Sequence, residues 1–265
     1  LVPSISWAKM SSYYSPRVAS SAGAGVGSLL MADSLFLNPA SSAFFKKKSL
    51  SYFYQNNSGD LDGKSHTLAA MDTTAMVQGG LAYQTRNEFD NKRTRLTLNT
   101  SKNLSQNLSL GVNYSYTWDK NSPAHYKRNW QQLTLGATYI LSPAISLGAV
   151  VIDPFHRTGD ESKIILGTHI SLSQSFFLIG DISSQAFDDF SETLAWRSAA
   201  QIRIMRDFYF RLGFFNDKQE NNKGNSLGFG WYAPKLLFDV SYRNIKDIDS
   251  SAKAKEINLG IGVRF

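Results

Sequence analysis

The chain has 265 residues, of which 42% are hydrophobic, and its formal net charge is +7. It contains no cysteine, which excludes disulfides and thiolate metal sites and is typical of an exported protein. It also contains no run of about 18 apolar residues, so it has no transmembrane helix. The basic residues form no clustered face with interleaved aromatic side chains, and we therefore expect no nucleic-acid partner.

The first part of the chain, residues 1–47, is rich in Ser, Ala and Gly and reads SSAGAGVGSLLMADSLFLNPASSAFF at its centre. Its Gly23-x-Gly25-x-Gly27 motif follows no strand and lacks the Lys-Ser/Thr of a phosphate loop. Lys46-Lys47-Lys48 lies at the junction between this segment and the first predicted strand. These lysines either contact anionic phospholipid headgroups or form a solvated charge run.

From residue 48 onward, apolar and polar residues alternate with a period of two, which predicts β-strands. In NLSLGVNYSYTW the apolar side chains share one face, and Ser, Gly, Asn and Thr share the other. The pattern occurs in fourteen segments, which are 50–56, 66–71, 77–86, 93–101, 107–118, 132–139, 145–152, 163–172, 176–183, 194–204, 208–215, 226–232, 237–243 and 256–265.

The connections between these segments alternate in length. Short polar turns follow the even-numbered segments, and longer polar loops such as NNSGDLDGK follow the odd-numbered ones. Transmembrane barrels have short periplasmic turns and longer outer loops, so both termini are predicted to be periplasmic. The last strand ends on Phe265, and this pattern resembles the C-terminal signal read by the outer-membrane assembly machinery.

A soluble β-sandwich also alternates, but its strands usually have about five or six residues. Several segments here have the length of about nine to eleven residues that a tilted strand needs to cross a bilayer. Aromatic residues gather near strand ends, as at Tyr114, Tyr116 and Trp118. We therefore predict an all-β protein, a 14-stranded antiparallel transmembrane β-barrel over residues 48–265, in contact with membrane lipid in the outer membrane of a Gram-negative bacterium.

A barrel of this size has a lumen too wide for wall side chains alone to fill. The segment 1–47 is well placed to plug it, and glycines on the inward face leave room for such a plug. These inward glycines are Gly111, Gly136, Gly148, Gly167, Gly213, Gly228, Gly230, Gly260 and Gly262.

Three motifs of the first segment carry a family resemblance. They are Gly23-Ala24-Gly25-Val26-Gly27, Ala32-Asp33-Ser34 and Asn38-Pro39-Ala40. Together they resemble the hatch, or plug, of the FadL family of long-chain fatty acid transporters. Related barrels include aromatic-hydrocarbon transporters and the PorV-type proteins of type IX secretion. The resemblance implies an N-terminal hatch and a kink in the third strand that opens the wall sideways for an apolar substrate.

The resemblance also suggests a substrate path. Gly79-Gly80 falls in the third strand, where paired glycines permit a bulge or else pack closely against the hatch. Asn38 is expected to cap a turn or to bond to the wall, with Pro39 fixing the next residue. The predicted path residues are Gly79, Gly80, Asn38, Pro39 and Ala40.

Alternation also places charged residues inside the lumen. They are Arg93, Arg95, Arg197, Arg203, Arg211, Arg243, Arg264, Asp181, Asp239 and Glu256. One hypothesis is a basic lumen that favours an anionic headgroup. The favoured hypothesis is that the arginines pair with lumen acids and with carbonyls of the hatch, because buried charge needs partners.

No pattern in the chain indicates catalysis. Its four histidines lack metal-ligand spacing, GxSxG and HExxH are absent, and His169 with Ser171 lies on the wrong face for an outer-membrane lipase. We therefore expect neither an enzyme, nor a metal, nor a cofactor.

Two functions follow as hypotheses. The first is passive diffusion of small hydrophobic molecules through a FadL-like barrel with a lateral opening. The second is a non-transporting, PorV-like subunit with a protein partner in an outer-membrane assembly. Its basis is that the third and fourth outer loops, DKNSPAHYKR and DPFHRTGDESK, are short and polar, unlike the capture loops of the fatty acid transporters.

Overall fold

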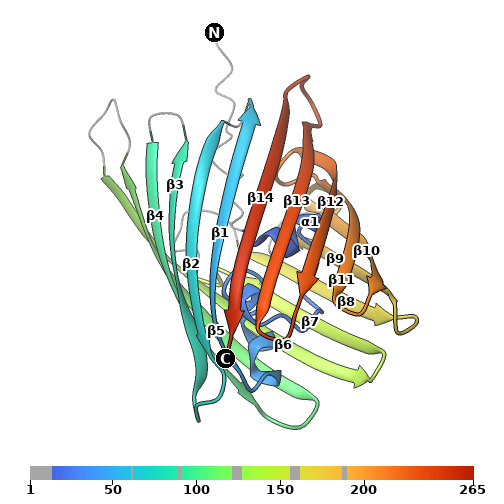
Figure 1. The fold of residues 1–265 in the computed structure, drawn as a ribbon. Coiled ribbons are helices and arrows are strands. Elements are labelled where there is room, and N and C mark those ends of the chain that lie inside the picture. The colour runs from blue at the N-terminus through green and yellow to red at the C-terminus, as the bar shows by residue number, and fades with distance from the viewer. Residues whose placement is uncertain (1–13, 61, 89–90, 121–126, 156–161, 187–189) are drawn as a thin grey trace.

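The computed structural model describes residues 14–60, 62–88, 91–120, 127–155, 162–186 and 190–265. These residues form fourteen antiparallel strands in one closed barrel, in which each strand pairs with the next and β1 pairs with β14 (Figure 1). The strands are β1 (Lys48–Gly59), β2 (Gly63–Asp72), β3 (Gln78–Glu88), β4 (Asn91–Asn103), β5 (Leu108–Lys120), β6 (Lys127–Ser142), β7 (Ile145–Ile152), β8 (Lys163–Ser171), β9 (Phe176–Gln185), β10 (Ala195–Met205), β11 (Phe208–Asp217), β12 (Asn222–Tyr232), β13 (Leu236–Asp247) and β14 (Lys253–Arg264). The predicted fold class and strand number are confirmed.

Short helices complete the described chain. They are α1 (Pro16–Ser20), η2 (Ala32–Leu35), η3 (Pro39–Phe44) and α2 (Phe190–Thr193). No helix in the described part of the chain is long and apolar enough to cross a membrane.

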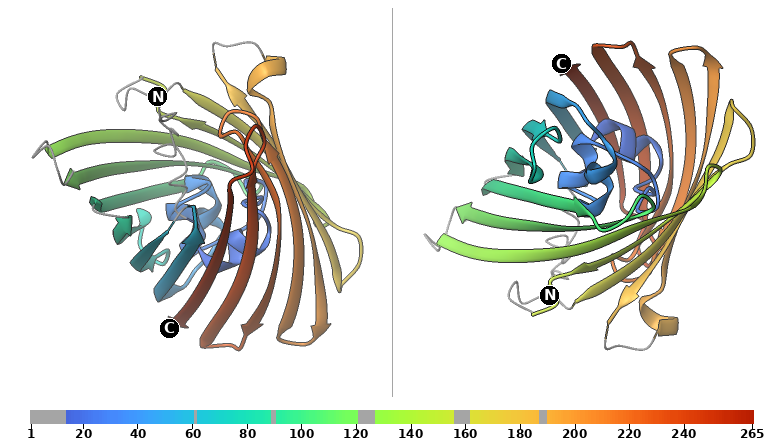
Figure 2. Two further views of the ribbon diagram at one scale, coloured as in Figure 1. Left: turned by 90° about the horizontal axis from the view of Figure 1, so that it is seen from above. Right: turned by 90° about the horizontal axis from the view of Figure 1, so that it is seen from below.

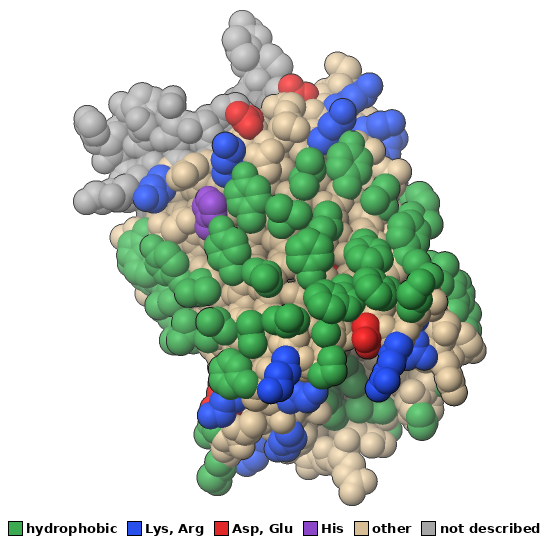
Figure 3. Space-filling model, in the orientation of Figure 1, with side chains coloured by type: hydrophobic (Ala, Val, Ile, Leu, Met, Phe, Trp, Pro, Cys, Tyr) green, Lys and Arg blue, Asp and Glu red, His purple; other side chains and the backbone are tan. Residues whose placement is uncertain are grey.

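The two faces of the wall differ as the period of two predicts. In β14, Ile257, Leu259 and Ile261 are 45%, 40% and 55% exposed on the outer face, whereas Glu256 and Asn258 are buried on the inner face. Similar apolar side chains continue around the outside as a belt with charged residues above and below it (Figure 3). Because an apolar belt between polar rims matches the cross-section of a bilayer, this outer face is suited to contact lipid.

The strands extend further than polarity alone predicted. β1 reaches Gly59 and β2 begins at Gly63, so most of the segment predicted as the loop NNSGDLDGK is strand. The alternation of polarity ends at the edge of the apolar belt, but backbone pairing does not depend on side-chain polarity and continues beyond it. We call the end of the barrel that carries the connections after odd-numbered strands the loop end.

The opposite end, with the connections after even-numbered strands, is called the turn end. Phe265 lies there, where its backbone N–H donates to Lys48 O and its carbonyl accepts from Lys48 N, so the last residue is paired beside the start of β1 (Figure 1).

The N-terminal segment, defined here as residues 14–47, lies inside the barrel (Figure 2). Ser15 caps α1, with Pro16 at its first position, and Asn38 caps η3, with Pro39 in the same place. Most residues of the segment are buried against the wall. Residues 1–13 of the predicted hatch lie outside the described residues.

Inward glycines make room for this segment. A Cβ added at Gly111 would overlap the backbone of Pro39 and Ala40, and one added at Gly148 would overlap the carbonyl of Val26. At Gly136 it would overlap the side chain of Asn38. The expectation that glycines bring the wall close to the segment is confirmed at these positions.

Adding a methyl group at Gly148 tests this fit. Gly148→Ala is expected to destabilise the barrel by about 1–3 kcal/mol, because the obstructing atom is backbone and cannot rotate away. The midpoint of urea unfolding, followed by the heat-modifiable band on a denaturing gel, measures the effect. The matched control is Gly180→Ala on β9, where the nearest heavy atom would be 3.9 Å from the new Cβ. Equal midpoints for the two variants would contradict the fit.

Candidate functional site

The barrel wall holds the N-terminal segment through a buried carboxylate. Asp181 on β9 accepts hydrogen bonds from the backbone N–H groups of Gly25 (2.8 Å) and Val26 (3.0 Å). Gly25 has φ +145°, a conformation that L side chains rarely adopt. The glycine-rich motif thus presents its N–H groups to an anion, but that anion is the protein's own Asp181, in line with the exclusion of a phosphate loop.

Asn38 makes a second anchor and plays both of the predicted structural roles. Its Nδ2 donates to Val26 O (2.8 Å), Ala137 O (3.0 Å) and Thr138 Oγ1 (3.0 Å). Its Oδ1 accepts from the N–H of Ala40 at 3.0 Å, which caps η3. One buried amide therefore ties two parts of the segment to β6.

Other polar side chains of the wall serve the carbonyl groups of the segment. Because the segment has little regular structure, these carbonyls need partners outside it. The wall donors and their acceptors are Asn99 to Pro39 O, Asn103 to Ala43 O, Ser109 to Ala40 O, Asn113 to Ser34 O, Ser146 to Gly27 O and Ser226 to Ser20 O.

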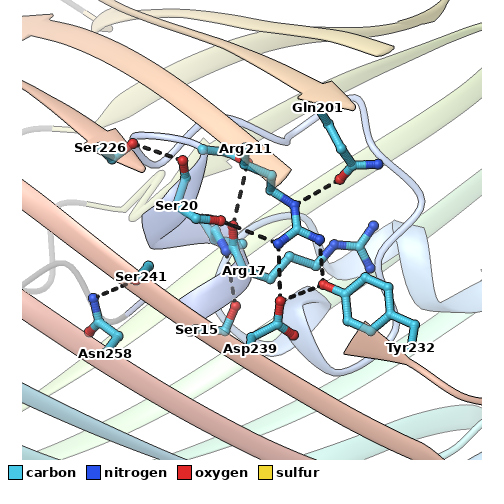
Figure 4. A network of polar contacts seen from close by, with 12 residues as sticks. Ser15, Arg17, Ser20, Gln201, Arg211, Ser226, Tyr232, Asp239, Ser241 and Asn258 are labelled. Carbon is cyan, nitrogen blue, oxygen red and sulfur yellow. Dashed lines mark hydrogen bonds and ion pairs between the residues drawn. The ribbon is translucent and has the colours of Figure 1, made fainter. Parts of the chain in front are cut away.

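A charged network surrounds Arg211 of β11, which is fully buried (Figure 4). Its Nη1 lies 3.0 Å from Asp239 Oδ1, and its Nε donates to Gln201 Oε1 at 2.8 Å. Tyr232 accepts from Arg211 Nη2 and donates to Asp239 Oδ1 at 2.6 Å. Arg211 Nη1 also reaches Ser20 Oγ at 3.4 Å, which links the network to α1.

Two further predicted arginines also pair with acids. Arg197 bonds to Asp217, and Arg243 Nη1 lies 3.2 Å from Glu256 Oε2. The guanidinium of Arg243 also lies between aromatic rings, with Cζ 5.3 Å from the centroid of Tyr14 and 4.9 Å from that of Phe215. The pairing hypothesis therefore describes this part of the lumen better than an open basic lumen does.

The remaining predicted arginines make other contacts. Arg95 donates to Thr117 Oγ1 at 3.0 Å, and Arg93 Cζ lies 5.2 Å from the ring centroid of Trp130. Arg203 is half-buried opposite Tyr209, next to a register shift in β10. Arg264 lines a pocket, described below, that it shares with Tyr232 and Asp239 of the Arg211 network.

The sequence did not identify several members of these networks. Asp217 falls in a stretch predicted as loop, and Gln201, Tyr232 and Ser20 carry no charge that marks them as partners. Once the register of β12 and β13 is known, Tyr232 and Asp239 become recognisable as neighbours, because Asp239 pairs with Gly230, two residues before Tyr232 in β12.

A bulge, one of the two alternatives for Gly79-Gly80, is absent from the structure. Gly79 pairs with Asp72 and Thr100, and Gly80 pairs with Met71 and Asn99, in unbroken register on both sides. A Cβ at Gly80 would overlap the sulfur of Met71, and one at Gly79 would overlap Asn99 O. Glycine permits a bulge but does not impose one, and here it allows close approach of neighbouring strands in a closed wall.

Apolar residues of the segment pack against the wall beside Gly80. We call this group the β2–β3 cluster; it comprises Met31, Leu35, Ala69, Met71 and Ala82, with Ala32, Phe36, Phe45 and Phe53 packed against it. A pocket at the turn end shares Met31, Ala32 and Phe53 with the cluster. Its empty volume, open mouth included, is about 480 Å³, and Arg17, Asp33 and Arg264 also line it.

A second pocket of about 460 Å³ opens at the loop end and is mainly polar. Arg86, Arg197, Asp217, Arg243 and Glu256 are among the residues that line it. The two pockets therefore lie at opposite ends of a lumen that the N-terminal segment occupies.

These features define a class: a closed barrel with an apolar outer belt and a lumen occupied by its own N-terminal segment. No family model matches the chain, and no curated protein matches it. Solved structures do match. The CymD monoaromatic hydrocarbon channel has a TM-score of 0.73 at 12% identity over 95% of this chain and 97% of that one.

Three further solved structures share the architecture. The Ralstonia pickettii toluene transporter TbuX has a TM-score of 0.72 at 10% identity, covering 96% of this chain and 98% of that one. The Pseudomonas putida toluene transporter TodX has a TM-score of 0.71 at 9% identity, covering 95% and 97%. A Pseudomonas aeruginosa FadL homologue has a TM-score of 0.59 at 13% identity, covering 95% and 98%. The chain thus has a FadL-like fold.

The anchor at Asn38 can be tested with an isosteric change. Asn38→Asp is expected to destabilise the protein by about 3 kcal/mol, because it removes a donor and turns a carboxylate toward two carbonyl oxygens. Asn38→Ala is expected to cost less, since it introduces no charge. Urea midpoints measure both effects. Asn107→Asp, at an exposed position in a turn, is the control and should change the midpoint little; an equal loss there would contradict the anchor.

The network at Arg211 can be compared with an exposed ion pair. Arg211→Met is expected to cost about 3–5 kcal/mol, because it leaves Asp239 buried without its cation. Lys48→Met breaks the pair with Asp72, whose side chains are 48% and 44% exposed, and is expected to cost at most about 1 kcal/mol. The same unfolding assay measures both variants. If the two midpoints shift by similar amounts, Arg211 does not hold the network.

Proposed function

We propose that the protein is an outer-membrane channel through which small hydrophobic molecules diffuse passively, with the N-terminal segment as its hatch. The loop end faces outward, and the turn end, where Phe265 lies, faces the periplasm. The apolar belt and closed barrel support the membrane location. The fold shared with a monoaromatic hydrocarbon channel and two toluene transporters supports the transport of apolar molecules.

The single observation that carries this proposal is the β2–β3 cluster. The inner wall carries many buried Ser, Asn, Gln and Arg side chains, and at this cluster an apolar surface runs from a pocket to the wall at Gly80. Contact with such an apolar surface lowers the free energy of a hydrocarbon relative to water, whereas contact with a polar lumen does not.

Straight passage through the lumen is blocked by the hatch, which Asp181 and Asn38 hold in place. A lateral exit at Gly79-Gly80 is the alternative route. The pairs Met71–Gly80 and Asp72–Gly79 are the last two of the β2–β3 ladder, so an opening there requires only fraying of the strand ends. Met71 is flexible and fills the space beside Gly80, which makes it the side chain that must move.

The other parts of the proposal follow from the same architecture. Diffusion of an apolar solute down its gradient requires no cofactor and no catalytic residue. Phe265 is 71% exposed at the end of a fully paired strand, which leaves its ring available to the assembly machinery. The solved structures that share the fold do not support the alternative of a subunit in a secretion complex.

Uptake of radiolabelled toluene by cells that produce the protein tests the function. The host should lack channels of this fold, and cells with an empty vector give the baseline. Uptake is expected to rise several-fold, while uptake of a labelled disaccharide stays at the baseline. Gly80→Val is expected to reduce toluene uptake at least fivefold, because the added side chain competes with Met71 for the same space.

The matched control is Gly180→Val, which enlarges an outward-facing glycine of β9. It should leave uptake unchanged, and both variants must show the folded band in the outer membrane. Disaccharide uptake without toluene uptake would refute the channel for apolar molecules. Full uptake by the folded Gly80→Val variant would refute only this exit.

A further inference from the structure

The outer face of the barrel carries a row of lysines at the loop end. Lys223 of β12 lies directly opposite Lys246 of β13, which lies directly opposite Lys253 of β14. Directly opposed residues share a face of the sheet, and all three side chains are exposed. One row nearer the belt, Lys255 is opposite Asn244.

This arrangement is unfavourable for the protein alone, because like charges directly opposite each other destabilise a sheet. Nearby carboxylates accept hydrogen bonds from backbone N–H groups rather than from the ammonium groups of these lysines. Asp60 Oδ2 accepts from the backbone N–H of Lys253 at 2.8 Å, and Asp247 Oδ1 accepts from Ser250 N at 2.6 Å. Among the described residues, the ion pairs of the barrel do not include these lysines.

The position of the row relative to the belt indicates what neutralises it. Leu227, Tyr242 and Ile257 form a cross-strand row of the apolar belt, and Asn244 with Lys255 lies in the next row. The lysine row comes one step further, at about 7 Å per step of two residues. In Figure 3, lysine and arginine side chains gather directly above the belt on the side of β12–β14. Headgroups of the surrounding lipid lie at this height.

Asn244 adds hydrogen-bond donors to the positively charged surface that the lysines form. The hydroxyl of Tyr242 donates to Asn244 Oδ1 at 2.9 Å. This bond engages the oxygen of the amide, so what Asn244 offers to a ligand is its NH2 donor. Ammonium groups and amide N–H donors suit a phosphate better than a neutral sugar.

We propose that Lys223, Lys246, Lys253 and Lys255, with Asn244, form a binding surface for the phosphate groups of a phosphorylated glycolipid in the outer leaflet. The lysines neutralise its phosphates while Leu227, Tyr242 and Ile257 contact its acyl chains. The proposal uses the outward orientation of the loop end given above, but it does not depend on transport. Binding of this lipid removes the repulsion along the row and stabilises the β12–β14 side of the barrel.

Native mass spectrometry of the detergent-solubilised protein tests this surface with three probes: diphosphoryl lipid A, fully dephosphorylated lipid A and phosphatidylglycerol. The wild type is expected to bind diphosphoryl lipid A at least tenfold more tightly than either other lipid. The variant carrying Lys223→Gln, Lys246→Gln, Lys253→Gln and Lys255→Gln is expected to lose at least tenfold in affinity. Because toluene uptake is not measured, failure here is distinguishable from failure of the channel proposal.

The control changes four exposed lysines of the turn end by the same charge: Lys46→Gln, Lys47→Gln, Lys102→Gln and Lys235→Gln. It is expected to bind diphosphoryl lipid A within threefold of the wild type. Equal losses in the two variants, or equal affinity for the dephosphorylated lipid or for phosphatidylglycerol, would overturn the proposal. If the fourfold variant does not fold, two double variants replace it: Lys223→Gln/Lys246→Gln and Lys253→Gln/Lys255→Gln. Each is expected to lose at least threefold in affinity for diphosphoryl lipid A. Unchanged affinity in both double variants would also overturn the proposal.

Discussion

The rest of this structure depends on the pairing of β1 with β14. A bilayer offers no water to unpaired backbone groups, so a sheet can cross it only when its edges are joined. The closing ladder runs from Ser49 opposite Arg264 to Gly59 opposite Ala254, along nearly the full length of both strands. The strand that ends the chain is therefore also the strand that removes both edges of the sheet.

Closure on fourteen strands creates a lumen, and the N-terminal segment fills it at the cost of bringing irregular backbone into the interior. That backbone needs partners, and the inner wall supplies them with Asn, Ser and Asp side chains. The polar inner face of this barrel is therefore largely the complement of its own segment. The glycines at 111, 136 and 148 follow from the same requirement, because direct bonding needs close approach.

The buried charges follow from the same geometry. A period of two tells which face of a strand an arginine occupies, but its partner depends on how neighbouring strands are aligned. Alternation thus placed Arg211 and Asp239 inside the barrel, whereas Tyr232 and Gln201 became visible as their partners only with the register. Arg197 pairs with Asp217, which belongs to a stretch that looked like a loop because polarity stops alternating before the strand stops.

The sequence by itself determined the fold class, the number of strands and the inward or outward orientation of most side chains. These are local properties, set by alternating polarity against lipid and by the chemistry of turns. It also marked the N-terminal segment as different and its glycines and Asn38 as special. Only the tertiary structure decided which atoms those residues contact, that the wall is unbroken at Gly79-Gly80, and that three lysines from three strands form one row. Such facts depend on register and on closure, which join residues far apart in the chain and leave no local pattern.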